Sequence, residues 1–488
     1  MKNTIWVIYL LFLSSLSLAQ DISLFEKHQA ISQEQRFFKT YSLEDTIQIS
    51  NELISYSEIF HQNLVDSLNA GKVLHGKQLT TFHEIGSYFI GINQRLNDFI
   101  KQDDSRVVTK AKLEQLNSFF RIYYPFYEND KFRRFINDED LSFGITRFQI
   151  HNAIMSLLDK EKLQDLARNS RNQNQHYSDL IRFIKNESKI NALVKNYKRL
   201  NRLDLKVDRN QDLAYNLSRD FGNTVGRVRW RKGYLWKNQA VLEEIYENLK
   251  PLDIITEKTY FALTDRFIPG HFGHNAIWLG TKDQLEEIGM WHHPAIIPYQ
   301  EQIAEGKSII EVDRSGSHLK TLKDFMNVDE LAIIRVNRLS FSSINLERTY
   351  NILLAQLGKI YDFNFDVETT DTLVCSELIY QSFEEIFWPT EDYLGRTTIS
   401  PDNVASLALY NNPPVDLVYY AAQKSKNDFK YKNLDDLASD VGFKKVGQLY
   451  KKTEKKCRRR GRRRICHEVL IDLEYSDHDL IPNLDLTW

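Results

Sequence analysis

A cysteine and two other residues lie in segments that could together perform nucleophilic chemistry. Cys375 follows a loop rich in Asp and Thr and opens an apolar-periodic run, so we expect it at the start of a helix. There the unpaired N–H groups and the helix dipole favour the thiolate, which is the nucleophilic form of cysteine. A buried structural cysteine is the alternative, and it is the commoner role for a lone cysteine.

A cysteine nucleophile needs a base, and the base needs a group that orients it. His274 opens a β-like run, although the chain has thirteen histidines and coincidence is a rival explanation. Glu311 lies near the end of the next apolar, strand-like run. If the two strands are antiparallel neighbours, Glu311 would hold one ring nitrogen while the other faces the sulfur. An ion-pairing surface glutamate is the alternative.

The first residues predict export. Residues 1–19 combine an early lysine, an apolar stretch over 5–13 and a small-x-small end, which is typical of a secretory signal peptide. We expect cleavage near Ala19-Gln20 and a periplasmic or extracellular protein; an uncleaved anchor is the alternative. Because no later stretch is apolar enough to cross a bilayer, we expect a chain that does not span the membrane.

Export makes the cysteine count informative. The chain has three cysteines, and an oxidising compartment favours pairing, which leaves one over. Cys457 and Cys466 flank Gly461 and would face each other across a β-hairpin, so we predict a disulfide between them. A zinc site of these two with His467 matches no usual ligand spacing. Cys375 is then the free thiol.

Changes in residue composition and hydrophobic pattern divide the mature chain into three parts. Residues 20–250 are predicted to form a mostly helical domain, with a capping box at Ser42 and apolar stripes over 49–68, 79–100 and 180–200. Residues 251–427 are predicted to form an α+β domain. Its expected strands are 275–279, 308–312 and 331–336, and its expected helices are 342–357 and 374–387. Residues 428–488 form a basic C-terminal extension.

The charge of the chain is balanced overall but not locally. The formal net charge is −2, so no global field indicates nucleic acid or an acidic partner. The run KKTEKKCRRRGRRRIC in the extension is strongly basic. A solvated face is the ordinary interpretation of such a run, and an anionic envelope surface is the functional one. We expect no nucleic-acid binding, because no aromatic residues are interleaved for base stacking.

Several segments, taken in order, resemble the permuted papain-like amidases, which are the YiiX/YaeF-like relatives of NlpC-type cell-wall peptidases and lecithin:retinol acyltransferases. The resemblance covers roughly residues 254–427 and reaches neither the helical region nor the basic tail. It implies a circularly permuted papain-like (NlpC-type) domain with an antiparallel sheet. The matching segments are Gly270–Gly280, Ile310-Glu311, Tyr361-Asp362 with Phe365, Cys375–Leu378 and Pro401-Asp402.

The resemblance assigns roles to individual residues. It implies Cys375 as the nucleophile, His274 as the general base and Glu311 as the third member of the site. Tyr361 matches a tyrosine that related enzymes keep near the oxyanion. Ser376 and His271 complete the candidate oxyanion and substrate-binding residues. Glu311 is followed by Val-Asp-Arg, where the family more often has a small residue, and this departure puts the third role in doubt.

We therefore expect an exported cysteine hydrolase of amidase or peptidase type. It would act through an acyl-enzyme on an amide of a cell-envelope peptide or an N-acyl compound, with no cofactor and no metal. His292 and His293 do not suggest a metal site, because adjacent residues of an extended strand point to opposite faces. The alternatives are an acyltransferase or lipid esterase on the same fold, and a non-catalytic envelope binding or scaffold protein.

Overall fold

The computed structural model divides into two compact units, residues 1–214 with 481–488 and residues 215–480. Among the described residues, no helix has the length and apolar character that a membrane span requires. The predicted signal peptide, its cleavage point at Ala19-Gln20, and the positions of Phe365 and Gly461 lie outside the described residues. The structure describes residues 41–475 apart from 71, 128, 141–142, 171–174, 205–228, 237, 262–269, 338–342, 363–366, 368–369, 371, 394–395 and 461–462.

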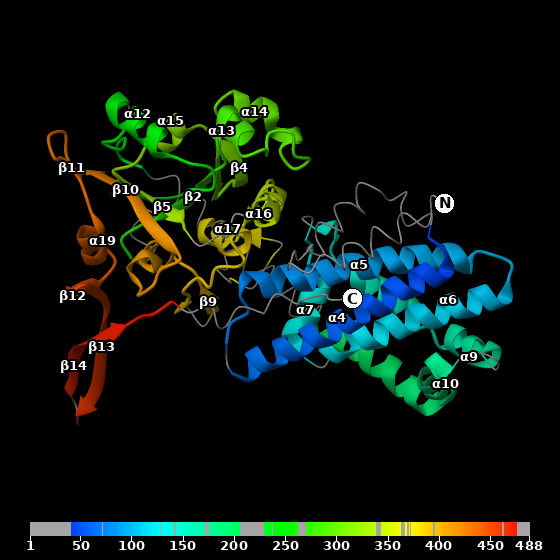
Figure 1. Cartoon of the computed structure of the whole chain (residues 1–488). Helices are drawn as coiled ribbons and strands as arrows, with labels where there is room; N and C mark the ends of the chain where they lie inside the picture. Colours follow the sequence, from blue (N-terminus) through cyan, green and yellow to red (C-terminus); the bar gives the residue numbers. More distant parts are fainter. Residues whose placement is uncertain are drawn as a thin grey trace. The chain divides into compact units, whose positions relative to one another are not determined.

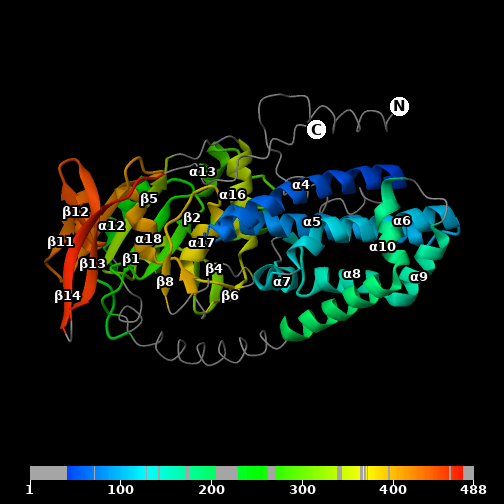
Figure 2. The same cartoon turned by 90° about the horizontal axis from the view of Figure 1, so that it is seen from below.

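The first unit is helical, as its apolar periodicity predicts. Three long helices, α4 (Leu43–Asn69), α5 (Gly76–Ile100) and α6 (Ser105–Ser118), pack against one another (Figures 1 and 2). Ser42 forms the predicted capping box, since its Oγ accepts the Asp45 N–H at 3.1 Å while the Asp45 carboxylate accepts the Ser42 N–H at 3.1 Å. The described remainder comprises α7 (Asp130–Asn137), α8 (Gln149–Leu157), α9 (Lys160–Asn169), α10 (Ser178–Lys185) and a helix over 187–204.

The second unit is built on a seven-stranded antiparallel sheet, which confirms the predicted α+β class. Its strand order is β11-β10-β5-β1-β2-β3-β4. Each of the three strands predicted from the sequence exists within about one residue of its expected limits. The strands are β1 (Ile254–Lys258), β2 (His274–Trp278), β3 (Ile309–Asp313), β4 (Gly316–Lys320), β5 (Glu330–Val336), β10 (Val415–Gln423) and β11 (Phe429–Tyr431).

Helices cover both faces of this sheet (Figure 1). Helices α12 (Gln239–Asn248) and α15 (Leu322–Phe325) join Trp278, Ile333 and their neighbours in one apolar core. Helix α17 (Cys375–Ser382) packs on β2 and β3, and α16 (Ser343–Ala355) packs on α17. Helix α12 precedes residue 251, where the change in sequence texture places the start of the α+β domain. The predicted helix over 374–387 is shorter than expected, because it ends at Phe383, which leaves the helical conformation.

The segment after residue 427 extends the second unit. Strand β11 lies at the edge of the main sheet, and α19 (Leu434–Asp440) leads into a second sheet of β12 (Phe443–Val446), β13 (Leu449–Arg460) and β14 (Arg463–Asp472). Strands β13 and β14 form the predicted hairpin, with Cys457 directly opposite Cys466. The two cysteines form the predicted disulfide, and Cys375 is free and buried.

Candidate active site

Cys375 is the first residue of α17, as its sequence context predicts. The carboxylate of Glu377 accepts the N–H of Val374, three residues before it, at 2.7 Å and so closes the first turn of the helix. The helix therefore begins at the thiol, where the orphan N–H groups of the first turn favour a negative sulfur. The residue is only 7% exposed, so the thiol lies in a largely desolvated position.

Strand register brings His274 and Glu311 together. Ala276 of β2 pairs with Glu311 of β3 in the antiparallel ladder. Residues two apart in a strand share a face, so His274 and Glu311 are diagonal neighbours on one face of the sheet. His274 Nε2 lies 3.0 Å from Glu311 Oε2. The contact that the sequence predicted between these two side chains is present.

His274 also lies beside Cys375, close enough to lower the pKa of the thiol. Since Glu311 occupies Nε2, Nδ1 is the ring nitrogen left for the sulfur. Burial alone raises the pKa of the Cys375 thiol, but the charge and hydrogen bond of His274 outweigh it and hold that pKa below its usual value. Burial opposes the charged imidazole too, yet the Cys375 thiolate and Glu311 raise the pKa of His274 well above its ordinary range. The arrangement therefore favours a thiolate–imidazolium pair.

Glu311 is held from two sides. While Oε2 faces His274, Oε1 lies 2.7 Å from Lys320 Nζ and 3.2 Å from His318 Nε2. Burial alone raises the pKa of Glu311, but the hydrogen bonds from both histidines and the charge of Lys320 hold it well below its usual value. Glu311 is therefore ionised beside His274, which is the state that orients an imidazolium.

Asn275 contacts both the nucleophile and its neighbour. Its backbone lies close enough to the Cys375 thiol to lower the pKa of that thiol further. Its side-chain Nδ2 donates to Ser376 Oγ at 2.8 Å. Ser376 itself is fully buried, so its hydroxyl supports the junction between β2 and α17 and is shielded from solvent.

Tyr361 lies on the short strand β6 (Ile360–Tyr361), which pairs with β7 (Thr372–Leu373) directly before α17. Burial and then the nearby charge of Cys375 raise the pKa of Tyr361 well above its ordinary value. The hydroxyl is therefore neutral and can donate a hydrogen bond near the sulfur.

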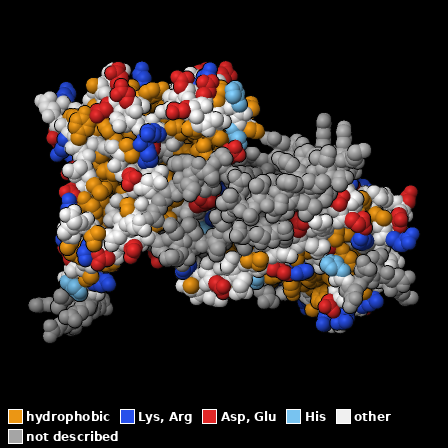
Figure 3. All heavy atoms as spheres, in the orientation of Figure 1, with side chains coloured by type: hydrophobic (Ala, Val, Ile, Leu, Met, Phe, Trp, Pro, Cys, Tyr) orange, Lys and Arg blue, Asp and Glu red, His pale blue; other side chains and the backbone are white. Residues whose placement is uncertain are grey.

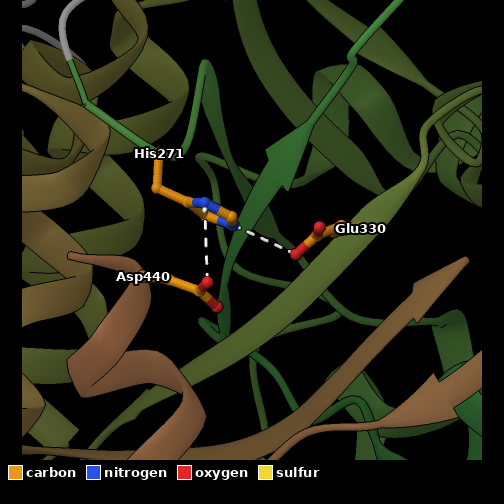
Figure 4. Close-up of side chains that lie close together, drawn as sticks. All are labelled: His271, Glu330 and Asp440. Atoms are coloured by element: carbon orange, nitrogen blue, oxygen red, sulfur yellow. Dashed lines mark hydrogen bonds and ion pairs between the residues drawn. The ribbon is translucent and has the colours of Figure 1, made fainter. Parts of the chain in front are cut away.

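His271 makes its contacts elsewhere. Its Nε2 lies 3.0 Å from Glu330 Oε2 and 3.0 Å from Tyr420 Oη. Its Nδ1 faces Asp440 Oδ1 at 3.8 Å (Figure 4). Of the six residues singled out from the sequence, the structure gathers Cys375, His274, Glu311, Tyr361 and Ser376, whereas His271 joins a separate cluster of side chains.

Three residues around the site were not found by sequence reasoning: Asn275, His318 and Lys320. Asn275 follows the candidate base directly, and this adjacency was the available signal. His318 and Lys320 lie two residues apart on β4. This strand forms a hairpin with β3, in which His318 pairs with Glu311. Recognising 316–320 as a strand would have placed both side chains on the face of Glu311.

Comparison with known protein families gives a match to part of the second unit. Residues 248–453 match the family model described as "Permuted papain-like amidase enzyme, YaeF/YiiX, C92 family". The matched range includes β1 to β5, α17, β10, β11 and α19, and it extends into β13. No curated protein and no solved structure gives a significant match to the chain.

Proposed function

We propose that the protein is a cysteine hydrolase that cleaves an amide through an acyl-enzyme on Cys375, because residues 248–453 match the permuted papain-like amidase family. The observation that carries the proposal is the contact of His274 with Glu311 at 3.0 Å, together with the effect of the same imidazole on the pKa of the Cys375 thiol. A nucleophile, a base and an orienting carboxylate in this relation are what acyl transfer requires.

The proposed reaction begins with the thiolate–imidazolium pair. The Cys375 sulfur attacks the substrate carbonyl carbon, and the carbonyl electrons move onto its oxygen. The backbone N–H of Cys375 and the hydroxyl of Tyr361 are the candidate donors to that oxyanion, and such a donor typically contributes about 3 kcal/mol. When the tetrahedral intermediate collapses, His274 protonates the leaving amine and the acyl group stays on sulfur. Water, deprotonated by His274, then releases the acid and regenerates the thiol.

The substrate we propose is an amide of the cell envelope, either a peptide or an N-acyl compound. The family description supports an amide over an ester, since it names amidases. An acyltransferase or a lipid esterase would use the same acyl-enzyme and differ in the group that enters or leaves. A non-catalytic binding protein would have no reason to place a base and a carboxylate in line behind a buried thiol.

Trapping the acyl-enzyme tests the proposal. Full-length protein is mixed with p-nitrophenyl acetate, and release of p-nitrophenolate is followed while intact-mass and peptide mapping locate the acetyl group. We expect a burst with one acetyl on Cys375, and a rate about a hundredfold lower in His274→Ala, because a positioned base typically contributes at least that much. His292→Ala, at an exposed position, is the matched control and should react like wild type.

If the folded protein acquires no acetyl group on Cys375, the proposal of a cysteine hydrolase is wrong, and a non-catalytic binding protein is favoured instead. The same assay with N-acetyl p-nitroanilide separates the reaction types. Acylation by the anilide as well as the ester supports an amidase, whereas acylation by the ester alone favours an esterase or acyltransferase.

We further propose that the protein is exported and that its basic hairpin contacts an anionic surface of the envelope. Exposed Lys455, Lys456 and His467 lie next to the disulfide, and Figure 3 shows Lys and His side chains on this hairpin. Fractionation of producing cells tests both points. The mature chain, beginning at Gln20, is expected outside the cytoplasm and bound to the envelope until salt releases it. Recovery of an uncleaved cytoplasmic chain would contradict both.

A further inference from the structure

The turn that leads into the candidate base is held by a residue far away in the sequence. Asp402 lies in the first turn of α18 (Pro401–Ser406). Its Oδ2 accepts the His271 N–H at 2.8 Å, and its Oδ1 accepts the Phe272 N–H at 2.8 Å. Both carboxylate oxygens therefore bind consecutive backbone N–H groups two and three residues before His274.

The geometry of the turn allows this close approach only with glycine at its start. Gly270 has a φ of +109°, and a Cβ built there would lie 2.5 Å from Asp402 Oδ2. At the other end, the Gly273 N–H donates to the Glu257 carbonyl at 2.9 Å, and His274 begins the pairing with β1 opposite Glu257. The turn 270–273 is thus clamped at the start by Asp402 and at the end by the sheet.

The side chain of His271 clamps the same turn from the opposite direction. Its ring contacts Glu330 of β5 and Asp440 of α19, which are drawn in Figure 4. Glu330 is fully buried, and burial alone raises its pKa, but the hydrogen bonds from His271, Lys432 and Tyr260 hold the pKa well below its usual value. His271 therefore meets an ionised carboxylate in a desolvated position, where such a hydrogen bond is strong.

The side chains of His271, Glu330 and Asp440 have the donor atoms that a metal site needs, but the ammonium group of a lysine already lies among them. His271, Glu330 and Asp440 each offer one ligand atom within 4.8 Å of the others. The Lys432 ammonium, however, lies 2.7 Å from Glu330 Oε2 and 2.5 Å from Asp440 Oδ2. Because the Lys432 ammonium already pairs with both carboxylates, the cluster is best explained as a structural network.

We infer that Asp402 and His271 are positioning residues, which hold the turn 270–273 so that the imidazole of His274 stays directed at Cys375. The inference rests on the proposed function, because a catalytic thiol is what gives the position of the imidazole its importance. The position of the imidazole relative to the thiol can nevertheless be tested without a substrate. It also gives α19 a role in the site, because Asp440 and Lys432, both in the segment after residue 427, complete the network around His271.

Alkylation of Cys375 by iodoacetamide tests the inference without any knowledge of the substrate. The other two cysteines form the disulfide, so peptide mapping reports on Cys375 alone. In Asp402→Asn, one of the two backbone N–H groups faces an amide nitrogen, and the turn should loosen. We expect alkylation below the wild-type inflection to slow about tenfold, the change that corresponds to a thiol inflection moved by one pH unit toward alkaline values.

Two further variants, a control and a second test of the same turn, accompany Asp402→Asn. Asp416→Asn is the matched control, because Asp416 is exposed and accepts a hydrogen bond from the Asn337 side chain at 2.8 Å, and its alkylation profile should equal that of wild type. His271→Gln keeps the backbone N–H for Asp402 and removes the ring, so we expect a smaller slowing in the same direction. It also serves if Asp402→Asn does not fold.

A merely structural role would lower the melting temperature and leave the pH inflection in place. Folded Asp402→Asn or His271→Gln with the wild-type alkylation profile would therefore overturn the inference. Failure of the proposed function has a different signature: no acetyl is transferred from p-nitrophenyl acetate to wild-type Cys375, while the alkylation profile still shifts in the variants.

Discussion

Cys375→Ala is expected to lose acetyl transfer from p-nitrophenyl acetate, with the rate falling by about a thousandfold or more. The reason is that the thiolate is the atom that would bond the carbonyl carbon, and the described residues around it supply a base and an orienting group. Loss of a nucleophile is among the largest single effects in acyl transfer, because the remaining donors and binding contacts cannot form the covalent intermediate.

The control for this result is the double variant Cys457→Ser/Cys466→Ser. It removes the disulfide of the β13–β14 hairpin and leaves Cys375 as the only thiol. We expect it to be acetylated on Cys375 at the wild-type rate. Residual acetylation of Cys375→Ala at the wild-type rate, with the native near-ultraviolet circular dichroism, would show that the reacting residue is another one.

Glu311→Gln is expected to narrow the pH range over which the thiolate–imidazolium pair exists. The pair forms above the lowered pKa of Cys375 and is lost above the raised pKa of His274. An ionised carboxylate favours the charged imidazole, so its removal lowers the pKa of His274 and weakens the support that the imidazolium gives to the thiolate. The alkaline limit should therefore move down and the acid limit up.

The two limits are measured separately. Iodoacetamide alkylation of Cys375 as a function of pH gives the acid limit, and we expect about a tenfold lower rate below the wild-type inflection in Glu311→Gln. Proton NMR of the His274 ring gives the alkaline limit. Glu305→Gln is the matched control, since Glu305 is exposed and pairs with Lys307. If both limits stay at the wild-type pH in folded Glu311→Gln, then Glu311 is not the third residue of the site.

The elements of the fold that depend on neighbours in sequence could be predicted from the sequence. The Ser42 capping box, the stripe of α4 and the start of α17 at Cys375 all follow from residues within a few positions of one another. The disulfide followed from the hairpin and from the odd cysteine count. Chain order and motif type were enough to select Cys375, His274 and Glu311 as candidates.

The interactions that depend on strand order and register became visible only in the folded chain. His271 has the same residue type as His274 and lies three positions away, yet it joins Glu330 of β5 and Asp440 of α19. Asp402 clamps a turn 130 and 131 residues earlier in the chain. Local patterns cannot encode such partners, because they depend on which strands are adjacent and how each strand is aligned.

The clearest contrast is at Glu311. From the sequence, Glu311 was a glutamate near the end of an apolar run whose following residues depart from the family pattern. In the structure, the pairing of Ala276 with Glu311 and of Glu311 with His318 places the carboxylate between His274, His318 and Lys320. Residue types and their order were therefore sufficient to name the nucleophile and its base. Antiparallel register, which sets the face and the neighbours of every side chain, brought Glu311 to the imidazole.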